Sequence, residues 1–177
     1  MIDRFRGRYF FLSNFYPCEI KHKGISYPSV EHYYVAQKFR GMQFYGGYHF
    51  TEPDFKEMIS SIKDPSDAKK LGRTRKIRSD WDSIKDDVMS FGVTYKFTKH
   101  QDLKDMLLAT GDDHIIEGNY HHDNYWGDCR CDNCNLKGGG ENKLGILQMS
   151  IRESIKDEEK PSLEDRVNRN FLSKGNE

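Results

Sequence analysis

The sequence feature that most constrains the fold is a run of apolar residues at helical spacing near the middle of the chain. These residues recur at steps of three or four: Trp81, Ile84, Val88, Phe91 and Tyr95. Because an α-helix advances about 100° per residue, this spacing places them on one side of a single helix. Ser79 or Asp80 can serve as the N-cap. The pattern therefore predicts a long helix that starts near residue 80.

Other patterns add shorter elements and together predict an α+β fold, a helix-rich single domain with a few short strands. Helices are expected over residues 29–39, 53–63, 64–72 and 102–110. Strands are expected over residues 7–12, 114–117 and 144–151, the last as a central strand or a strand-to-helix join, with a hairpin over 18–27. Residues 41–50 combine glycines with aromatic side chains, which indicates a loop.

The length of 177 residues is typical of one domain, which we expect to cover residues 1–155. A charged tail follows over residues 156–177. In this tail Leu163, Val167 and Phe171 stand at four-residue spacing, which fits a docking helix or a frayed terminus.

The charge balance and the N-terminus limit the partners of the chain. Lys plus Arg and Asp plus Glu both total 28, so no net positive charge is present to hold nucleic acid, which would have to be recognised locally. The N-terminal MIDRFRGRYFF carries charges where a signal peptide has its apolar region, and no apolar run reaches the length of a membrane helix. We expect a cytoplasmic protein without a membrane partner.

The stretch SVEHYYVAQKF, residues 29–39, carries an acid and an amine on one helical face. Glu31 and Lys38 are seven residues apart, which is two turns, and Tyr34 lies between them. Most other side chains of this stretch are apolar, so the helix is expected to be buried. A buried carboxyl or amine has a pKa shifted toward reactivity, whereas on a surface helix the two would be solvated charges.

A second candidate group lies in the polar loop over residues 118–142, which contains almost no aliphatic side chains. Trp126 has no helical or strand pattern around it there, so it can form a wall on which a flat base stacks. Asp128 can accept hydrogen bonds from a sugar, orient a water molecule, or simply stabilise a turn. Trp81 by itself is more typical of a core residue.

Three cysteines of the same loop, Cys129, Cys131 and Cys134, follow His121 and His122 closely. With an imidazole or Cys18 they could complete a four-ligand zinc site. The C-x-C-x-x-C spacing is not that of the paired zinc knuckle, and no second C-x-x-C follows. Free thiols in a reducing compartment are the favoured interpretation, and we expect neither a metal nor a cofactor.

Several segments, read together, resemble one known family. They are FLSNFYPCEI (11–20), YPSVEHYYVAQKF (27–39), AKKLGR (68–73), IRSDWDSIKDDVM (77–89), LLATGDDHIIEGN (107–119), YWGDC (125–129) and GENKLGILQMSIRE (141–153). The chain resembles the NADAR family, also called YbiA-like, over about residues 8–153. The resemblance implies a YbiA-like fold and an N-glycosidase that breaks a C1′–N bond on a ribose. The substrates it implies are riboflavin-pathway ribosylamino-pyrimidines or ADP-ribosylated guanine, possibly within nucleic acid.

The resemblance also implies which residues form the site. The residues that match the family motifs are Glu31, Lys38, Trp81, Trp126 and Asp128, with Asn14 and Phe15 at the pocket wall. Tyr34 shares the helix face, and Arg73 belongs to a set of arginines that could meet phosphates, with Arg4, Arg6, Arg8, Arg75 and Arg78. The cysteine-bearing loop departs from the glycine-rich sequence of many relatives.

The resulting hypothesis is a Schiff base on Lys38 with an opened ribose, with Glu31 moving the proton and Asp128 positioning water or a hydroxyl. Two alternatives stay open. The same aromatic pocket could bind ADP-ribose or a nucleotide without turnover, or the cysteine loop could make the chain a small zinc-dependent interaction protein. The oligomeric state is not visible in the sequence.

Overall fold

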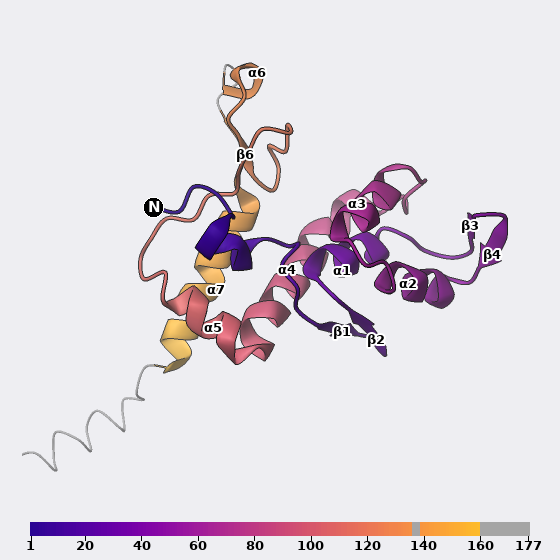
Figure 1. The fold of residues 1–177 in the computed structure, drawn as a ribbon, viewed down its shortest axis with the longest axis horizontal. Helices are drawn as coiled ribbons and strands as arrows, with labels where there is room; N and C mark the ends of the chain where they lie inside the picture. The colour runs from indigo at the N-terminus through magenta and orange to yellow at the C-terminus, as the bar shows by residue number, and fades with distance from the viewer. Residues whose placement is uncertain (136–138, 160–177) are drawn as a thin grey trace, which may run out of the picture.

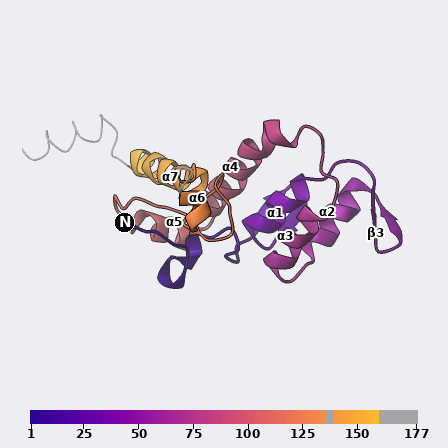
Figure 2. The same ribbon diagram turned by 90° about the horizontal axis from the view of Figure 1, so that it is seen from above.

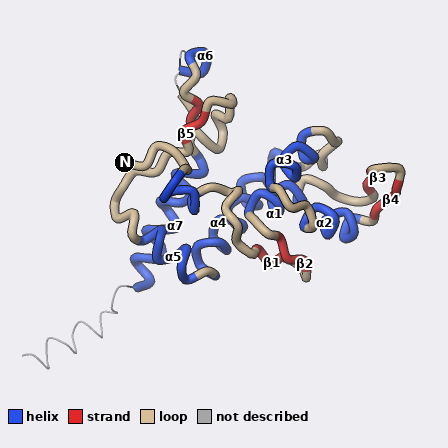
Figure 3. Tube along the Cα trace, viewed as in Figure 1, coloured by secondary structure: helices blue, strands red, loops and turns tan. Residues whose placement is uncertain are grey.

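The computed structural model describes residues 1–135 and 139–159, which form a helix-rich fold with a few short strands, as expected (Figures 1 and 3). The helices are the 3-10 helix η1 (Gly7–Leu12), α1 (Val30–Gln37), α2 (Glu52–Ser60), α3 (Pro65–Arg73), α4 (Trp81–Lys99), α5 (Gln101–Leu108), α6 (Asp132–Asn135) and α7 (Lys143–Glu159). The strands pair as β1 (Ile20–His22) with β2 (Ile25–Tyr27), β3 (Gln43–Tyr45) with β4 (Tyr48–Phe50), and β5 (Gly118–Asn119) with β6 (Asp128–Cys129). None of the described helices combines the length and apolar character that a bilayer crossing needs.

Helix α4 runs through the middle of the molecule. Figures 1 and 2 show α5 and α7 packed at one end of it and α1, α2 and α3 gathered near the other. The predicted helix is confirmed, but its most buried face is not the predicted stripe. Phe91 stays 40% exposed, whereas Met89, Val93 and Phe97 are buried. Phe91 packs at the edge of the core, with its ring centroid 5.3 Å from that of Tyr33.

Helix α1 is buried on every side, since all residues from Val30 to Gln37 are buried. It begins after Ser29, whose hydroxyl accepts a hydrogen bond from the backbone N–H of His32, which confirms the predicted cap. Helices α2, α3 and α4 and strand β2 pack around it. Any polar side chain that α1 carries is therefore withdrawn from bulk water.

Two antiparallel hairpins flank this helical core. The predicted hairpin over residues 18–27 is confirmed, with Ile20 opposite Tyr27. The loop predicted over residues 41–50 is wrong, because β3 and β4 form a second hairpin there. Gly46 and Gly47 have φ of 59° and 86°, a left-handed conformation that glycine adopts without steric cost and that suits a tight hairpin turn.

Two predicted strands near the N-terminus and in the second half are wrong. Residues 7–12 form η1, which follows the left-handed turn at Gly7, where φ is 55°. Residues 114–117 form no strand, although Ile115 makes an isolated parallel bridge with Ile2. A single bridge is too short to form a strand.

Helix α7 takes the place of the central strand predicted over 144–151. Leu144, Gln148 and Ile151 are buried at steps of four and three, so the apolar run has a helical period. The helix continues to Glu159. The docking helix expected in the tail lies outside the described residues.

Gly92 allows α4 to approach α1 closely, because a Cβ there would lie 3.0 Å from Cδ1 of Tyr33 and 3.2 Å from Cγ1 of Val30. We expect Gly92→Val to lower the free energy of unfolding by about 1–3 kcal/mol, since the added methyl groups overpack the crossing. Thr98→Val, at an exposed position of the same helix, is the matched control. Chemical denaturation measures both, and equal stability of the two variants would contradict the close approach.

Candidate active site

A cavity of about 430 Å³ lies where α1 meets α3, the loop after η1, and the segment from residue 117 to residue 126. It brings together most of the residues singled out in the sequence. The predicted residues that line it are Asn14, Phe15, Glu31, Tyr34, Lys38, Arg73 and Trp126. The cavity therefore joins four segments of the chain.

Two predicted site residues do not line this cavity. Trp81 packs against Tyr34, with ring centroids 5.0 Å apart, and its own ring centroid lies 5.8 Å from Nζ of Lys38. Trp81 thus packs behind Tyr34, which itself lines the cavity. Asp128, in β6, accepts a 2.7 Å hydrogen bond from the backbone N–H of Gly140. In this structure the Asp128 carboxylate connects two parts of the loop.

Glu31 is only 6% exposed, although it is ionisable. Its backbone N–H donates a 3.0 Å hydrogen bond to the carbonyl oxygen of Asn14, which fixes the loop against the first turn of α1. Burial raises the pKa of the Glu31 carboxyl, and the positive charges of Lys69 and Lys38 act in the opposite direction. Desolvation is the largest of these effects, so the environment favours the protonated form of this carboxyl.

Lys38, at the C-terminal end of α1, places its ammonium nitrogen 5.1 Å from the ring centroid of Tyr34. Burial lowers the pKa of Lys38, and the Glu31 carboxylate opposes this shift. Lys69 and Arg73 add positive charge nearby and lower the pKa further. A neutral amine is a nucleophile, so the environment favours the reactive form of Lys38.

Glu117 is a second carboxyl of the cavity, partly buried, and no pattern in the sequence identified it. Burial raises its pKa to about 8, and the neighbouring Asp123 carboxylate adds to the shift. Its Oε2 atom is buried without a hydrogen-bond partner in the described part of the chain. Glu117 is the last residue of the strand predicted over 114–117, and no sequence pattern relates it to the helix that carries Glu31 and Lys38. A carboxyl directly before a long polar loop was the one available signal.

Asp123 and Trp126 are held in place by a network within the loop. Oδ1 of Asp123 accepts hydrogen bonds from the backbone N–H groups of Tyr125 and Trp126, at 3.2 and 3.0 Å. Trp126 in turn donates from Nε1 to the hydroxyl of Tyr34 at 3.1 Å, with the two rings perpendicular. The tryptophan expected to stack on a base is thus fixed against α1.

The beginning of α7 anchors the same loop. The side chain of Asn142 accepts a hydrogen bond from the backbone N–H of Glu117 at 2.9 Å and donates one to the carbonyl oxygen of Ile115 at 2.9 Å. The backbone N–H of Leu144 donates to the carbonyl oxygen of Trp126 at 2.9 Å. Carbonyl groups of the loop thereby satisfy amides that the first turn of the helix leaves unpaired.

The opposite wall, at Ser13 and Asn14, is held by α4. Lys96 of that helix is fully buried and donates a 2.7 Å hydrogen bond from Nζ to the carbonyl oxygen of Ser13. Burial lowers the pKa of Lys96 to about 8. Asn14 donates to Sδ of Met89 at 3.3 Å, and its Oδ1 atom has no hydrogen-bond partner within the described residues. That oxygen is thus a buried acceptor that the described residues leave unpaired.

Positive side chains complete the lining. Of the arginines considered for phosphate contacts, Arg6 and Arg73 line the cavity, whereas Arg78 is paired with Asp80. Lys69 was not predicted; it lines the cavity, with Nζ 5.5 Å from the ring centroid of Phe15. His121, also missed, completes the side formed by the loop. Potential metal ligands of the described residues cluster outside this cavity, around the three cysteines.

Comparisons with known proteins agree with this description. The chain matches the NADAR domain over residues 4–156. It is 37% identical over 146 residues to an N-glycosidase of Nostoc punctiforme, covering 81% of this chain and 84% of the relative. It is 34% identical to the N-glycosidase YbiA of Escherichia coli, covering 81% and 79%. A riboflavin biosynthesis protein of Vibrio vulnificus is 37% identical over 83% of this chain, which spans 36% of that longer protein.

The fold has a counterpart among solved structures. The NMR structure of the E. coli protein YbiA superposes with a TM-score of 0.67 at 32% sequence identity, covering 92% of each chain. The N-glycosidase activity expected from the sequence is the activity for which the Nostoc and E. coli relatives are named. The chain belongs to the NADAR family.

Proposed function

We propose that this cavity hydrolyses the C1′–N bond of a ribosylated base through a Schiff base on Lys38. The observation that carries the proposal is that one amine, Lys38, and two carboxyl groups, Glu31 and Glu117, line one cavity, with Glu31 buried and the other two partly buried. Burial raises the pKa of each carboxyl and lowers the pKa of the amine, so it favours the neutral form of all three groups. Such groups are suited to proton transfer and nucleophilic attack at neutral pH.

The lining supports a nucleoside-like substrate. A volume of about 430 Å³ lies within the range of small-ligand sites. Trp126 and Tyr34 offer aromatic surface to a base, and Arg6, Lys69 and Arg73 can meet phosphate oxygens. These features support ribosylamino-pyrimidine intermediates of the riboflavin pathway and ADP-ribosylated guanine as substrate classes. The name of the Vibrio relative favours the first.

In the proposed reaction Glu117 begins protonated and gives its proton to the departing base nitrogen as the C1′–N bond breaks. The lone pair of Lys38 Nζ forms the new bond to C1′. Glu31 takes a proton from this nitrogen and passes it to the ring oxygen, so that the ribose opens to an imine. Water adds to the imine carbon and releases the sugar aldehyde. The proton left on the released amine then restores Glu117.

Water orientation is the step for which the sequence pointed to Asp128. The structure ties that carboxylate to Gly140, so we propose Asp128 as a positioning residue for the loop. Asp123 lines the cavity and is better placed to orient the water. Trp81 acts through Tyr34, against which it packs.

Trapping identifies the amine that forms the imine. With a ribosylated base and borohydride, wild-type protein should gain the mass of a reduced sugar adduct, and Lys38→Met should gain none. Activity of Lys38→Met should fall by about 100-fold or more, because the covalent route is lost. Lys69→Met is the matched control, since it removes the other lysine of the cavity and should keep the adduct.

The outcomes separate three possibilities. Full base release by Lys38→Met without an adduct would reject the Schiff base. An adduct that persists in Lys38→Met and disappears in Lys69→Met would move the nucleophile to Lys69. Ligand binding by wild-type protein without any base release would favour a nucleotide-binding module over an enzyme.

The raised pKa of Glu117 has a measurable effect on stability. Its pKa is about 8 in the folded protein against an ordinary value of 4.5, so between these pH values the unfolded chain has already released a proton that the folded protein retains. The free energy of unfolding therefore falls as pH rises through this window. Glu117→Gln should remove the penalty and stabilise the protein at pH 8 by about 1–3 kcal/mol, while activity is lost.

Thermal unfolding at several pH values measures this effect. The stabilisation by Glu117→Gln should be largest at pH 8 and should disappear below pH 4.5. Glu57→Gln, at an exposed position of α2, is the control and should change neither stability nor activity. A stabilisation that does not vary with pH would show that titration of Glu117 is not its cause.

A further inference from the structure

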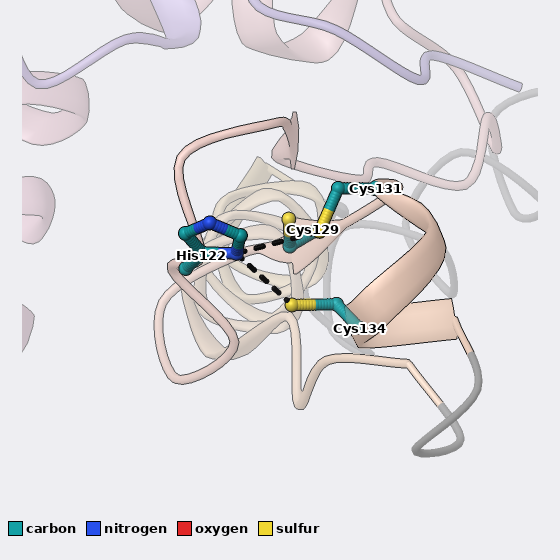
Figure 4. Close-up of side chains that lie close together, drawn as sticks. All are labelled: His122, Cys129, Cys131 and Cys134. Carbon is teal, nitrogen blue, oxygen red and sulfur yellow. Dashed lines mark hydrogen bonds between the residues drawn. The ribbon is translucent and has the colours of Figure 1, made fainter.

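Four side chains with metal-ligand chemistry converge outside the cavity. The ligand atoms of His122, Cys129, Cys131 and Cys134 all lie within 4.8 Å of one another. Figure 4 shows the imidazole and the three sulfur atoms pointing toward a common centre. Nδ1 of His122 lies 3.3 Å from Sγ of Cys131 and 3.5 Å from Sγ of Cys134. Thus four residues spread over 13 positions of a loop meet at one point.

The two nitrogen–sulfur distances are close to those of a tetrahedral zinc site. With Zn–S of about 2.3 Å and Zn–N of about 2.0 Å, tetrahedral angles place nitrogen and sulfur about 3.5 Å apart and two sulfurs about 3.8 Å apart. The two nitrogen–sulfur distances observed are 3.5 and 3.3 Å. One imidazole and three thiolates are also a ligand set typical of structural zinc, with no position left open for a substrate.

The surroundings of the sulfur atoms are polar in the way that thiolate ligands need. Asn124 accepts a 2.9 Å hydrogen bond on Oδ1 from the backbone N–H of Cys129, and its side chain also hydrogen-bonds to Cys134. Backbone N–H groups of His122 and Cys131 point to the sulfur of Cys129. Such outer contacts orient metal ligands and stabilise their negative charge.

Hydrogen bonds hold much of the loop, but the loop has few apolar side chains with which to pack. Figure 1 shows α6 at the tip of a segment that projects away from the helical body. His122 has a φ of 66°, an uncommon left-handed conformation that directs it into the cluster. Cys129 lies in β6, and Cys134 in α6 donates its backbone N–H to the carbonyl oxygen of Cys131 at 3.0 Å. Almost no aliphatic side chain is present to form a local core.

We propose that His122, Cys129, Cys131 and Cys134 bind one structural zinc ion that replaces a hydrophobic core in this loop. The favoured interpretation of the sequence was free thiols, because the C-x-C-x-x-C spacing lacks a second C-x-x-C pair. The structure supplies the fourth ligand from upstream, at His122. The site stands independently of the proposed reaction, since none of the four residues lines the cavity.

The position of the site gives the zinc ion a role in the cavity as well. His122 lies directly between two cavity-lining residues, His121 and Asp123. Asn124, which contacts two of the cysteines, precedes Trp126 by two positions. An ion bound at one end of this short segment therefore restricts the backbone that presents the cavity wall at the other end.

Metal analysis of the full chain, purified under reducing conditions, tests the site. We expect wild-type protein to retain about one zinc ion per chain and Cys129→Ser to retain less than one tenth of that amount. Cys18→Ser is the matched control, because Cys18 is a buried cysteine outside the cluster, and it should keep its zinc. Equal zinc in Cys129→Ser and wild type, or reduced wild-type protein that retains no zinc, would overturn the proposal.

Cobalt substitution provides a readout that does not depend on how the variants fold. Wild-type protein freed of metal by a chelator and titrated with Co²⁺ should show intense sulfur-to-cobalt charge-transfer absorption and the visible bands of tetrahedral cobalt, saturating at one equivalent. Added Zn²⁺ should abolish both. Absence of the charge-transfer absorption, or a spectrum of octahedral cobalt, would contradict thiolate coordination.

The link to the cavity is tested by the fluorescence of Trp126. In Trp81→Phe, Trp126 is the only tryptophan left. Removal of zinc should change its emission, because its contact with Tyr34 depends on the position of the loop. Emission that is identical with and without zinc would overturn the proposed restriction of the cavity wall.

Discussion

The burial of charged side chains on α1 is the constraint on which the rest of the structure depends. Helix α1 is enclosed on all sides, and its residues Glu31 and Lys38 extend into the cavity. Neither side chain can therefore be fully hydrated. Helix α3 brings Lys69 and Arg73 alongside, and the loop brings Asp123. Lys69 and Arg73 offset the desolvation of Glu31 but add to that of Lys38, for which Asp123 acts in the opposite direction. The burial of these charges therefore costs stability and favours their neutral forms.

The remaining elements position this enclosed helix and the wall opposite it. Helix α4 holds the Ser13–Asn14 segment through Lys96 and approaches α1 at Gly92. The first turn of α7 holds the other wall by hydrogen bonds to the backbone around Glu117. Both helices belong to the scaffold, yet each determines where a cavity residue lies. The precision of the site therefore depends on contacts between segments distant in the chain.

This dependence on contacts between distant segments explains how much the sequence could predict. Local signals were sufficient for α1, its Ser29 cap and the placement of Glu31 and Lys38 on one side of the helix, because helical spacing depends on neighbouring residues alone. Membership of the family was readable from short motifs. The position of Glu117 in the cavity was not, because it depends on a loop that contacts α1 from more than 80 positions away. The strand predicted at 144–151 failed because an apolar run by itself does not distinguish a strand from a buried helix.

The hydrogen bond between Trp126 and Tyr34 determines which hydrogen bonds one part of the cavity wall can still make. The Tyr34 oxygen accepts from the indole nitrogen, so its own proton remains to be shared. Burial raises the pKa of the Tyr34 phenol, which therefore keeps that proton throughout the neutral range. At this spot the wall can donate one hydrogen bond, and the second lone pair of the phenol oxygen can still accept one. A ligand group that both accepts and donates, such as a hydroxyl, can therefore use both capacities of one fixed atom.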